Sequence, residues 1–471
     1  MKKGIITTYV LVFGAIFLLL LSGLLGFILL QLRHSAQRLA WNQALHIAEA
    51  GINYYRWCLN NGVEANCLAE KPYYDLAGTE IGTFSLSVTS TVSCGTTISK
   101  LITSTGWSKN FPKIKRRIGT KYARESVAKY AYLLNDNVWA GADREIRGLY
   151  HSNGGIRMDG TNYSLVTSAQ EEWVLTRSFG YPPCPNACRM EGEKCICPGV
   201  FTTANGNEDL FDWPVPPFDF DKITVDLAQI KDLTDEYPRQ YYWPPVTDLD
   251  AEGKGYHLKF AGQTGKFEVW IITKLDSVLS YNSEEGWHYE YSIIDEEYLY
   301  GTYSVNPDCP LIFFEDDLWI EGEVKGKVTV ASANLISPTE DTDVWLPGNI
   351  DYTALDGSDG LALIGQRNVL IGPDSPETML LRGIFIAQKG HFSRNHYTGT
   401  APTKRGELLT IYGSIVSNGR VGTAWLNSAG QVVSGYLKRE NYVDPNLIYS
   451  PPPFVPYTSS EFKIIGWEEL E

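Results

Sequence analysis

The sequence lacks the signatures of the common enzyme classes. It contains no His-Glu-x-x-His zinc motif, no Gly-x-Ser-x-Gly nucleophile motif and no Walker-type phosphate loop. The segment Ala261-Gly-Gln-Thr-Gly-Lys266 stops short of such a loop, because Phe267 follows where Ser or Thr is needed. We therefore expect a protein that is not an enzyme. The run Glu315-Asp316-Asp317 leaves one alternative open, which is glycan cleavage by paired carboxylates.

Positive charge is also scarce. The chain has 40 Lys and Arg residues against 55 Asp and Glu residues, a formal net charge of −15. This balance disfavours a nucleic-acid backbone as the main partner, because phosphate binding needs clustered cations. One basic row does occur, and we interpret it as a solvated strand face; lipid headgroups, acidic subunits or DNA are its alternative contacts. The row consists of Lys113, Lys115, Arg117 and Lys121, opposite Ile114, Ile118 and Tyr122.

Charge is absent altogether from residues 5–32, and proline is absent from residues 5–60. The uncharged run holds 28 residues, whereas about 20 suffice to span a membrane. It is too long for the core of a secretory signal, and no small-x-small cleavage site follows it. Lys2 and Lys3 precede it, and the positive-inside rule places that end in the cytoplasm. The sequence predicts a single-pass membrane protein whose body lies outside.

The helix is expected to continue beyond the membrane. Small and apolar residues recur every three to four positions after Leu32, and Asn-Asn-Gly at 60–62 predicts its end. The outer half must bury this stripe on its own domain or on neighbouring subunits, whereas a plain membrane anchor would not need it. The stripe consists of Ala36, Leu39, Ala40, Ala44, Ile47, Ala48 and Ile52.

Two motifs in this segment resemble those of type IV pilins. Lys-Lys-Gly directly before the apolar run is similar to a class III leader, here residues 1–4, which prepilin peptidase cuts between Gly4 and Ile5. The stretch 44–55 resembles the helix signature of PilX-type minor pilins, with Ala48, Glu49, Ala50 and Gly51 at its centre. The resemblance implies a pilin-type helix over 5–60. It also implies other pilins, prepilin peptidase and the inner-membrane assembly machinery as partners.

Tyr9 departs from the pilin pattern, in which the fifth mature residue is Glu. In the family that Glu is thought to pair with the N-terminal amine of an adjacent subunit, and an unpaired carboxylate in hydrocarbon is costly. A subunit at the filament tip has no neighbour above it. The resemblance therefore implies a minor, tip-located subunit that takes part in assembly and presents a large head for adhesion or partner contact. The alternative is an anchored surface protein that is never assembled.

Beyond the helix the sequence predicts β structure, so the expected fold class is α+β. Residues 61–143 should form a small antiparallel head, with a short helical patch at 126–134. Residues 144–440 should form a large all-β body. A phrase recurs within it: an apolar residue, any residue, Gly, a β-forming run, a small residue, then Asn or Gln. It begins at Ile146, Leu381 and Ile411. This recurrence predicts the stacked rungs of a β-solenoid, with a β-sandwich as the alternative.

Both ends of the body extend the resemblance to PilX-type proteins. The phrase His151-Ser-Asn-Gly154 and the Pro-rich end are similar to segments of those chains, and residues 441–471 are expected to form a Pro-rich tail. Exposed aromatic residues beside acids, as in Tyr241-Tyr-Trp-Pro-Pro, suit adhesion to glycans or proteins, and they equally suit a core.

The eight cysteines predict disulfide bonds in an extracytoplasmic body. Cys58 and Cys67 flank a short loop and should pair, whereas Cys94 and Cys309 are either a long-range bridge or two buried thiols. A Pro-rich and Cys-rich insert at about 181–300 holds four more, for which two disulfides are expected and zinc is the alternative. Cys195 and Cys197 should each pair with one of the other two. These four are Cys184, Cys188, Cys195 and Cys197.

No cofactor is expected. Asp356-Gly-Ser-Asp359-Gly could cradle structural calcium, but it lacks the downstream bidentate Glu of an EF-hand, so we interpret it as a turn.

Overall fold

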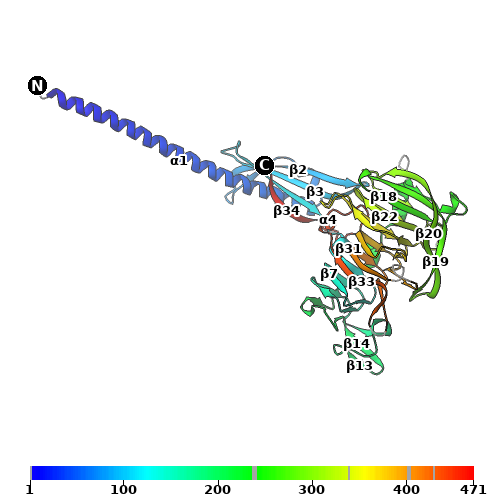
Figure 1. The fold of residues 1–471 in the computed structure, drawn as a ribbon. Helices are drawn as coiled ribbons and strands as arrows, with labels where there is room; N and C mark the ends of the chain where they lie inside the picture. Colours follow the sequence, from blue (N-terminus) through cyan, green and yellow to red (C-terminus); the bar gives the residue numbers. More distant parts are fainter. Residues whose placement is uncertain (1–2, 236–240, 338–339, 400–404, 428–429, 471) are drawn as a thin grey trace. The chain divides into compact units, whose positions relative to one another are not determined.

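A computed structural model describes residues 3–235, 241–337, 340–399, 405–427 and 430–470. The chain forms two compact units, which are described separately (Figure 1). Unit 1 comprises Met1–Thr91, Ser99–Ala123 and Lys463–Glu471, and unit 2 comprises Val92–Ile98 and Arg124–Phe462.

Unit 1 begins with one long helix, α1, which spans Lys3–Asn60 (Figure 1). Its 58 residues correspond to a length of about 87 Å. The helix ends where the sequence predicts, because Gly62 takes a φ of 66° that favours glycine and breaks the helical path. By length and composition this helix is suited to cross a membrane, with a mean hydropathy of 2.7 in its most apolar window.

A five-stranded antiparallel sheet completes unit 1. The strand order is β1-β2-β3-β4-β34, with alternation of buried and exposed residues along the central strands. On β4, Ile118 and Tyr122 are buried while Lys115 and Arg117 are exposed, which confirms the predicted basic face. The bounds are β1 Lys71–Tyr74, β2 Glu80–Ser93, β3 Thr96–Ser108, β4 Lys115–Ala123 and β34 Lys463–Leu470.

The fifth strand corrects the expectation of a tail at 441–471. β34 pairs antiparallel with β4, with Lys463 opposite Ala123 and Leu470 opposite Arg117. The end of the chain is therefore part of the small sheet. In the sequence, residues 124–462 of unit 2 therefore lie between β4 and β34, which are neighbouring strands of that sheet.

Unit 2 is built mainly from short strands that pair in parallel with strands one rung away. Each row of strands stacked in this way is called a rank. The longest, rank A, has β17 at one end and β16 at the other. In stacking order rank A contains β17 (Tyr242–Trp243), β21 (Leu311–Phe314), β23 (Lys327–Ser332), β26 (Gly360–Gly365), β28 (Thr378–Ala387), β31 (Arg405–Ser417), β5 (Tyr130–Leu134), β8 (Leu149–Ser152), β11 (Val166–Ser168) and β16 (Phe211–Asp212).

Two further ranks run beside rank A, and we call the three together the stack. Rank B contains β18 (Tyr256–Ala261), β22 (Leu318–Val324), β24 (Val344–Leu346), β27 (Val369–Ile371) and β29 (Phe392–Ser393). Rank C continues from the end of β22 through β25 (Ile350–Tyr352), the first parts of β28 and β31, β33 (Val432–Tyr442), β7 (Arg144–Arg147) and β10 (Thr161–Asn162). Strands therefore stack in parallel as the rungs of a solenoid do.

The recurring phrase of the sequence marks one corner of the stack. Gly148, Gly383 and Gly413 have φ of 156°, 150° and 152°, and each lies where the chain turns from rank C into rank A. At the other end of the rank A strands, Asn135 donates to Asn418 Oδ1 at 2.8 Å, and Asn153 donates to Asn135 Oδ1 at 2.7 Å. Two members of this amide ladder, Asn153 and Asn418, are residues at which the recurring phrase ends.

Both faces of rank A are buried, which explains its uninterrupted apolar runs. Every residue of β26 is buried, with Leu361 and Leu363 inside the stack and Ile364 on the other face. That other face packs with Ile230 of α3 (Leu227–Asp235) and Leu447 of α4 (Pro445–Ile448). The stack interior is the largest apolar cluster among the described residues.

Three expectations about unit 2 need correction. The head does not extend to residue 143, because residues 124–143 belong to unit 2 and include β5 of rank A. The helical patch at 126–134 is only a single 3₁₀ turn, Val127–Lys129, followed by β5, because stacking between β31 and β8 favours a strand there. The insert expected at 181–300 is not separate from the body. β18 pairs in parallel with β22, and β19 (Lys266–Asn282) pairs with β18 and with β20 (Gly286–Ser304).

The remaining short elements complete unit 2. A three-stranded sheet joins β6 (Val138–Ala140), β9 (Ile156–Met158) and β15 (Val200–Phe201), and another joins β12 (Glu172–Leu175), β13 (Arg189–Glu191) and β14 (Lys194–Pro198). Two short strands, β30 (His396–Tyr397) and β32 (Ala424–Leu426), and the helix α2 (Phe220–Ile223) lie in the connections.

Candidate functional site: the outer half of the long helix

One face of the outer half of α1 is buried against the sheet of its own unit. Its residues lie three or four positions apart, as one side of a helix requires. They are Ala40, Ala44, Ile47, Ala48, Gly51, Ile52, Tyr55 and Cys58. This confirms most of the predicted stripe. Leu39 is the exception: it is 60% exposed although Ala40 beside it is buried, because Leu39 lies on the other side of the helix, and Ala36 is only partly buried.

The small residues of the helix signature allow this close packing. A Cβ on Gly51 would lie 2.9 Å from Cδ2 of Phe84 and closer still to the Ser104 hydroxyl. On the sheet side, a Cβ on Gly106 would lie 3.0 Å from the Cα of Ala48 and closer to the backbone of Ala44. Backbone therefore meets backbone where α1 crosses β3. The sequence alone did not identify Gly106, because a lone glycine in a strand carries no signal of what it contacts.

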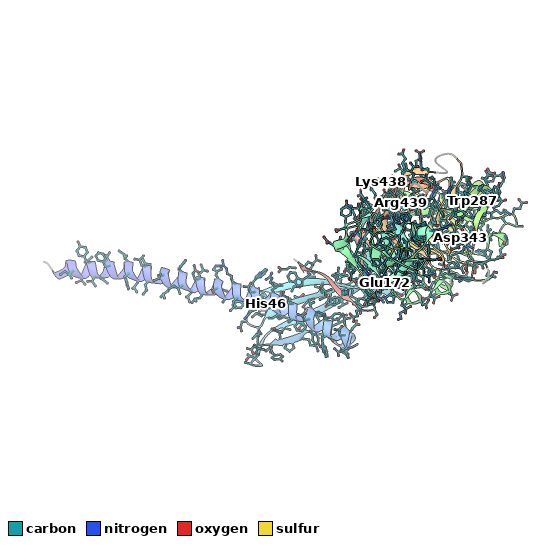
Figure 2. The ribbon with its side chains drawn as sticks, turned by 90° about the horizontal axis from the view of Figure 1, so that it is seen from below. His46, Glu172, Trp287, Asp343, Lys438 and Arg439 are labelled. Carbon is teal, nitrogen blue, oxygen red and sulfur yellow. A yellow bond between two sulfur atoms is a disulfide. The ribbon has the colours of Figure 1, made fainter. Side chains whose placement is uncertain are left out.

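The other signature residues lie beside the contact and not within it. Glu49 is partly exposed, with 41% of its side chain accessible, and its carboxylate lies 3.3 Å from Nδ1 of His46 (Figure 2). Ala50 and Glu49 border an open groove of about 500 Å³ within unit 1. The groove is lined by Gln43, His46, Ile47, Glu49, Ala50, Asn53, Tyr73 and Ile81. The signature thus divides between a packing face and a side that unit 1 leaves open.

Large apolar side chains remain exposed on the outer half of α1. Leu39, Trp41 and Trp57 are 60%, 49% and 55% exposed. The Arg116 guanidinium lies 4.8 Å from the Trp41 ring, which leaves that ring half open. Large apolar residues exposed on the outer half of this helix are more than solubility requires, and such exposure is typical of interaction surfaces.

The inner half of α1 is apolar on all sides. The most apolar window has none of its residues buried, and Tyr9 is 60% exposed. Such a helix must be covered by lipid or by other helices. Gly4 and Ile5 lie in the first turn of α1, and the side chain of Ile5, like residues 1 and 2, lies outside the described residues.

A disulfide fixes the point where α1 ends. Cys58 on the last turn bonds to Cys67, which confirms the predicted pair. Between them, Glu64 accepts a hydrogen bond from the Tyr55 hydroxyl at 3.3 Å and pairs with Lys100 on β3. Burial, with the nearby Glu64 carboxylate, raises the pKa of Tyr55 to about 12, so the hydroxyl stays a donor. The turn after α1 is therefore held to both the helix and the sheet.

The other six cysteines are also bonded in pairs. Cys184 bonds to Cys195 and Cys188 to Cys197, as expected for the cluster, and their sulfurs are thus not available as zinc ligands. Cys94 and Cys309, whose state the sequence left open, form a long-range bridge across 215 residues of chain.

Both acidic candidates accept hydrogen bonds from groups of the protein. Asp356 accepts from the Ser358 N–H at 2.9 Å, as in a turn, and Asp359 accepts from the Gly326 N–H and the Thr353 hydroxyl, both at 2.7 Å. Asp316 accepts from the Val246 N–H at 2.8 Å, and Asp317 accepts from the Asp343 N–H at 2.8 Å.

The pKa of Asp317 distinguishes it from an ordinary turn carboxylate. Burial and the neighbouring Asp343 carboxylate raise the pKa of Asp317 to about 7.

The comparisons with known proteins find one likeness to report. No protein family and no curated protein matches the chain. Among solved structures it is similar to the competence-associated pilin ComZ from Thermus thermophilus. The sequences are 13% identical, the likeness covers 91% of this chain and 97% of the other, and the TM-score is 0.29. A TM-score this low does not establish a shared fold.

Proposed function

We propose that this chain is a type IV pilin-like minor subunit, anchored in the membrane by α1 before it enters a filament. The observation that carries the proposal is the division of α1 into faces. One face of its outer half packs on its own sheet, while Leu39, Trp41, Trp57 and the whole inner half remain uncovered. Neighbouring helices in a filament would cover these surfaces, and a plain anchor would not need the outer ones.

Processing and partners follow from the same helix. We propose that prepilin peptidase cuts between Gly4 and Ile5, that other pilins pack along α1, and that the inner-membrane machinery assembles them. Unit 2 then lies outside the cytoplasm, which suits its disulfide-bonded cysteines. The proposed role is non-enzymatic.

A position at the filament tip is favoured by Tyr9 and by the size of unit 2. Tyr9 supplies no carboxylate for an adjacent N-terminal amine, so the subunit has less to gain from a neighbour above it. Unit 2 holds most of the chain, and a body of that size would crowd its neighbours if it recurred along a shaft. At the tip it would be free to contact a surface or a partner protein and to help start assembly.

The test compares two surface variants in cells that make filaments. Leu39→Arg places a charge on the uncovered face of α1, and Leu355→Arg is the matched control because Leu355 is 62% exposed on unit 2. We expect both proteins to reach wild-type levels in the membrane. Only the Leu39 variant should be missing from sheared filaments, because a charge in a helix interface is left without a partner. Equal incorporation of both would contradict the assembly interface.

Three further measurements address the finer points. Mass spectrometry of the mature chain should find Ile5 as its first residue. Gold labels against unit 2 should lie at filament ends, and deletion of the gene should reduce filament number. Labels along the shaft would contradict the tip position. Normal piliation in the deletion strain, with an intact Met1, would leave a non-assembling anchored surface protein.

A further inference from the structure

The hairpin of β19 and β20 has one face that unit 2 covers. It forms a long pair of strands at one margin of the unit (Figure 1). On its inner face, Glu290 is buried and accepts hydrogen bonds from Asn395 at 2.6 Å and from the Tyr397 hydroxyl at 2.9 Å. Trp319 of the stack donates to the Ser292 carbonyl at 2.7 Å. The inner face therefore has its partners within the unit.

The outer face of the same hairpin carries an uncovered row of aromatic residues. Trp287, Tyr289 and Tyr291 alternate along β20, so they lie on one face, and they are 54%, 68% and 63% exposed (Trp287 is labelled in Figure 2). We call these three residues the aromatic row. The ring of Tyr281 on β19 lies 5.4 Å from that of Trp287 and 5.4 Å from that of Trp425.

A solvent-exposed strand face does not need such residues. Threonine favours strands and is compatible with water, whereas Trp and Tyr are the residues that dominate the centres of protein interfaces. An exposed patch of this kind marks a surface for a partner.

The edge of β20 is open beside the aromatic row. β19 pairs on its other side with β30, and within the described part of the chain β20 pairs with β19 alone. Over 286–291 the pairing with β19 is regular, and β20 contains neither Lys nor Pro. Lys and Pro are common protections of edge strands. An unprotected edge can pair through its backbone with an extended segment of another chain.

The charge of the hairpin indicates what kind of segment would bind at this edge. Residues 266–304 include eight Asp and Glu residues and two Lys residues, and six of the acids remain when the buried Glu290 and Glu297, which pairs with Lys259, are left out. Lys274 already pairs with Asp295 and lies 3.6 Å from Glu296. Glu284 and Glu285 at the turn contact only histidines as cationic partners among the described residues. An uncharged glycan would not require this acidic excess, whereas a basic peptide is complementary to it.

We infer that the outer edge of β20 binds an extended, lysine- or arginine-rich segment of another protein. The segment adds to the hairpin as a further antiparallel or parallel strand through backbone hydrogen bonds. Its apolar side chains lie against the aromatic row, and its cations face the carboxylates at and near the turn. This inference does not depend on assembly of the chain into filaments.

The experiment uses the full chain in detergent micelles with fluorescent peptides. The probe is a short peptide that alternates Lys with Val and Thr. One comparison peptide has Glu in place of every Lys, and another has Pro at alternate positions, which removes backbone donors. The variant changes Trp287→Thr, Tyr289→Thr and Tyr291→Thr together. The matched control changes two exposed residues elsewhere on unit 2, Tyr163→Thr and Leu355→Thr.

Fluorescence anisotropy should show the Lys peptide bound, with affinity falling about tenfold or more in the triple variant and unchanged in the control. Added salt should weaken binding, and the Glu and Pro peptides should not bind. Equal affinity for the Lys and Glu peptides, or no loss in the triple variant, would overturn the inference. So would binding of a neutral oligosaccharide such as cellohexaose in place of the peptide. Self-association of the wild type that the triple variant abolishes would assign the face to a second copy.

Discussion

Substitution of Gly106 tests whether close backbone packing holds α1 on its sheet. A methyl group at this position would meet the backbone of Ala44 and Ala48, neither of which can move without shifting the helix. Gly119 provides the matched control in the neighbouring strand β4. A Cβ there would lie 3.1 Å from Cδ1 of Leu470, which is the end of a flexible side chain. Both changes are Gly→Ala in one sheet.

The expected magnitudes differ for a physical reason. Removing a glycine reduces the freedom of the unfolded chain and contributes about 0.4–1 kcal/mol of stability where the new side chain fits. Overpacking against a rigid neighbour costs about 1–3 kcal/mol. We therefore expect Gly119→Ala to be close to neutral or slightly stabilising. Gly106→Ala should destabilise the contact between α1 and β3 by about 1–2 kcal/mol.

Hydrogen exchange measured by mass spectrometry resolves the effect locally. Peptides that cover residues 40–58 of α1 report on release of the helix from the sheet, whereas unit 2 provides an internal reference. A loss of about 1–2 kcal/mol corresponds to exchange that is roughly 5 to 30 times faster. Equal protection of this segment in the Gly106 and Gly119 variants would refute the reasoning. Faster exchange in unit 2 would show that the effect is not local.

Three further predictions concern unit 2. Replacing both Cys94 and Cys309 by Ser should lower the free energy of unfolding by about 5 kcal/mol, against about 2.5 kcal/mol for the same change at Cys58 and Cys67. The difference is expected because the two disulfides close loops of different length, and urea unfolding of each variant measures it. Asn135→Ala removes the middle of the amide ladder and should cost about 1 kcal/mol, whereas the exposed amide Asn427→Ala outside the ladder should cost less in the same assay. The raised pKa of Asp317 means that the folded chain binds this proton more tightly than the unfolded chain, so its contribution to stability is present below pH 4 and is lost as pH rises through about 7. Asp317→Asn should therefore stabilise the chain by up to about 4 kcal/mol at pH 8 and have little effect at pH 4, and an equal effect at both pH values would contradict the assignment.

The parts of the fold that local chemistry determines were predictable from the sequence. The uncharged run, the absence of proline and the Asn-Asn-Gly stop were sufficient to predict α1 and its end. The stripe was predictable because small and apolar residues recur at helical spacing. Leu39 was wrongly included, because apolar spacing alone does not show which of the neighbours Leu39 and Ala40 faces the sheet.

Features that depend on long-range pairing were not predictable. The strand Lys463–Leu470 is mostly exposed and shows no alternation, so its sequence resembles a tail. Eight cysteines allow 105 connectivities, and nothing local joins Cys94 to a residue 215 positions away. The segment 181–300 was predicted to be an insert because its composition differs from that of the body, although β18 within it continues a rank of the stack.

The order of the rungs is the part of the architecture furthest from the sequence. The chain enters rank A in its middle at β5, proceeds to one end at β16, and then returns along the outside to the other end at β17. The returning segment contacts the amides of the ladder side: Asn153 donates to the Phe218 carbonyl and Gln388 to the Val225 carbonyl. The later rungs then build back toward β5. A phrase that recurs at 146, 381 and 411 identifies rungs, but it contains no information on which rungs touch.

This order has a consequence for how the body is joined to the small sheet. Because the last rungs end beside the first, the two ends of unit 2 lie together: Ser126 bridges Tyr457, and Thr458 donates to the Glu125 carbonyl at 2.8 Å. Residues 124–462 can thus connect β4 to β34, which are adjacent antiparallel strands, as a loop would. Insertion between neighbouring strand ends leaves the register of the host sheet intact. In the proposed function, the helix and sheet that contact other subunits and the body that contacts a partner therefore belong to two different compact units of one chain.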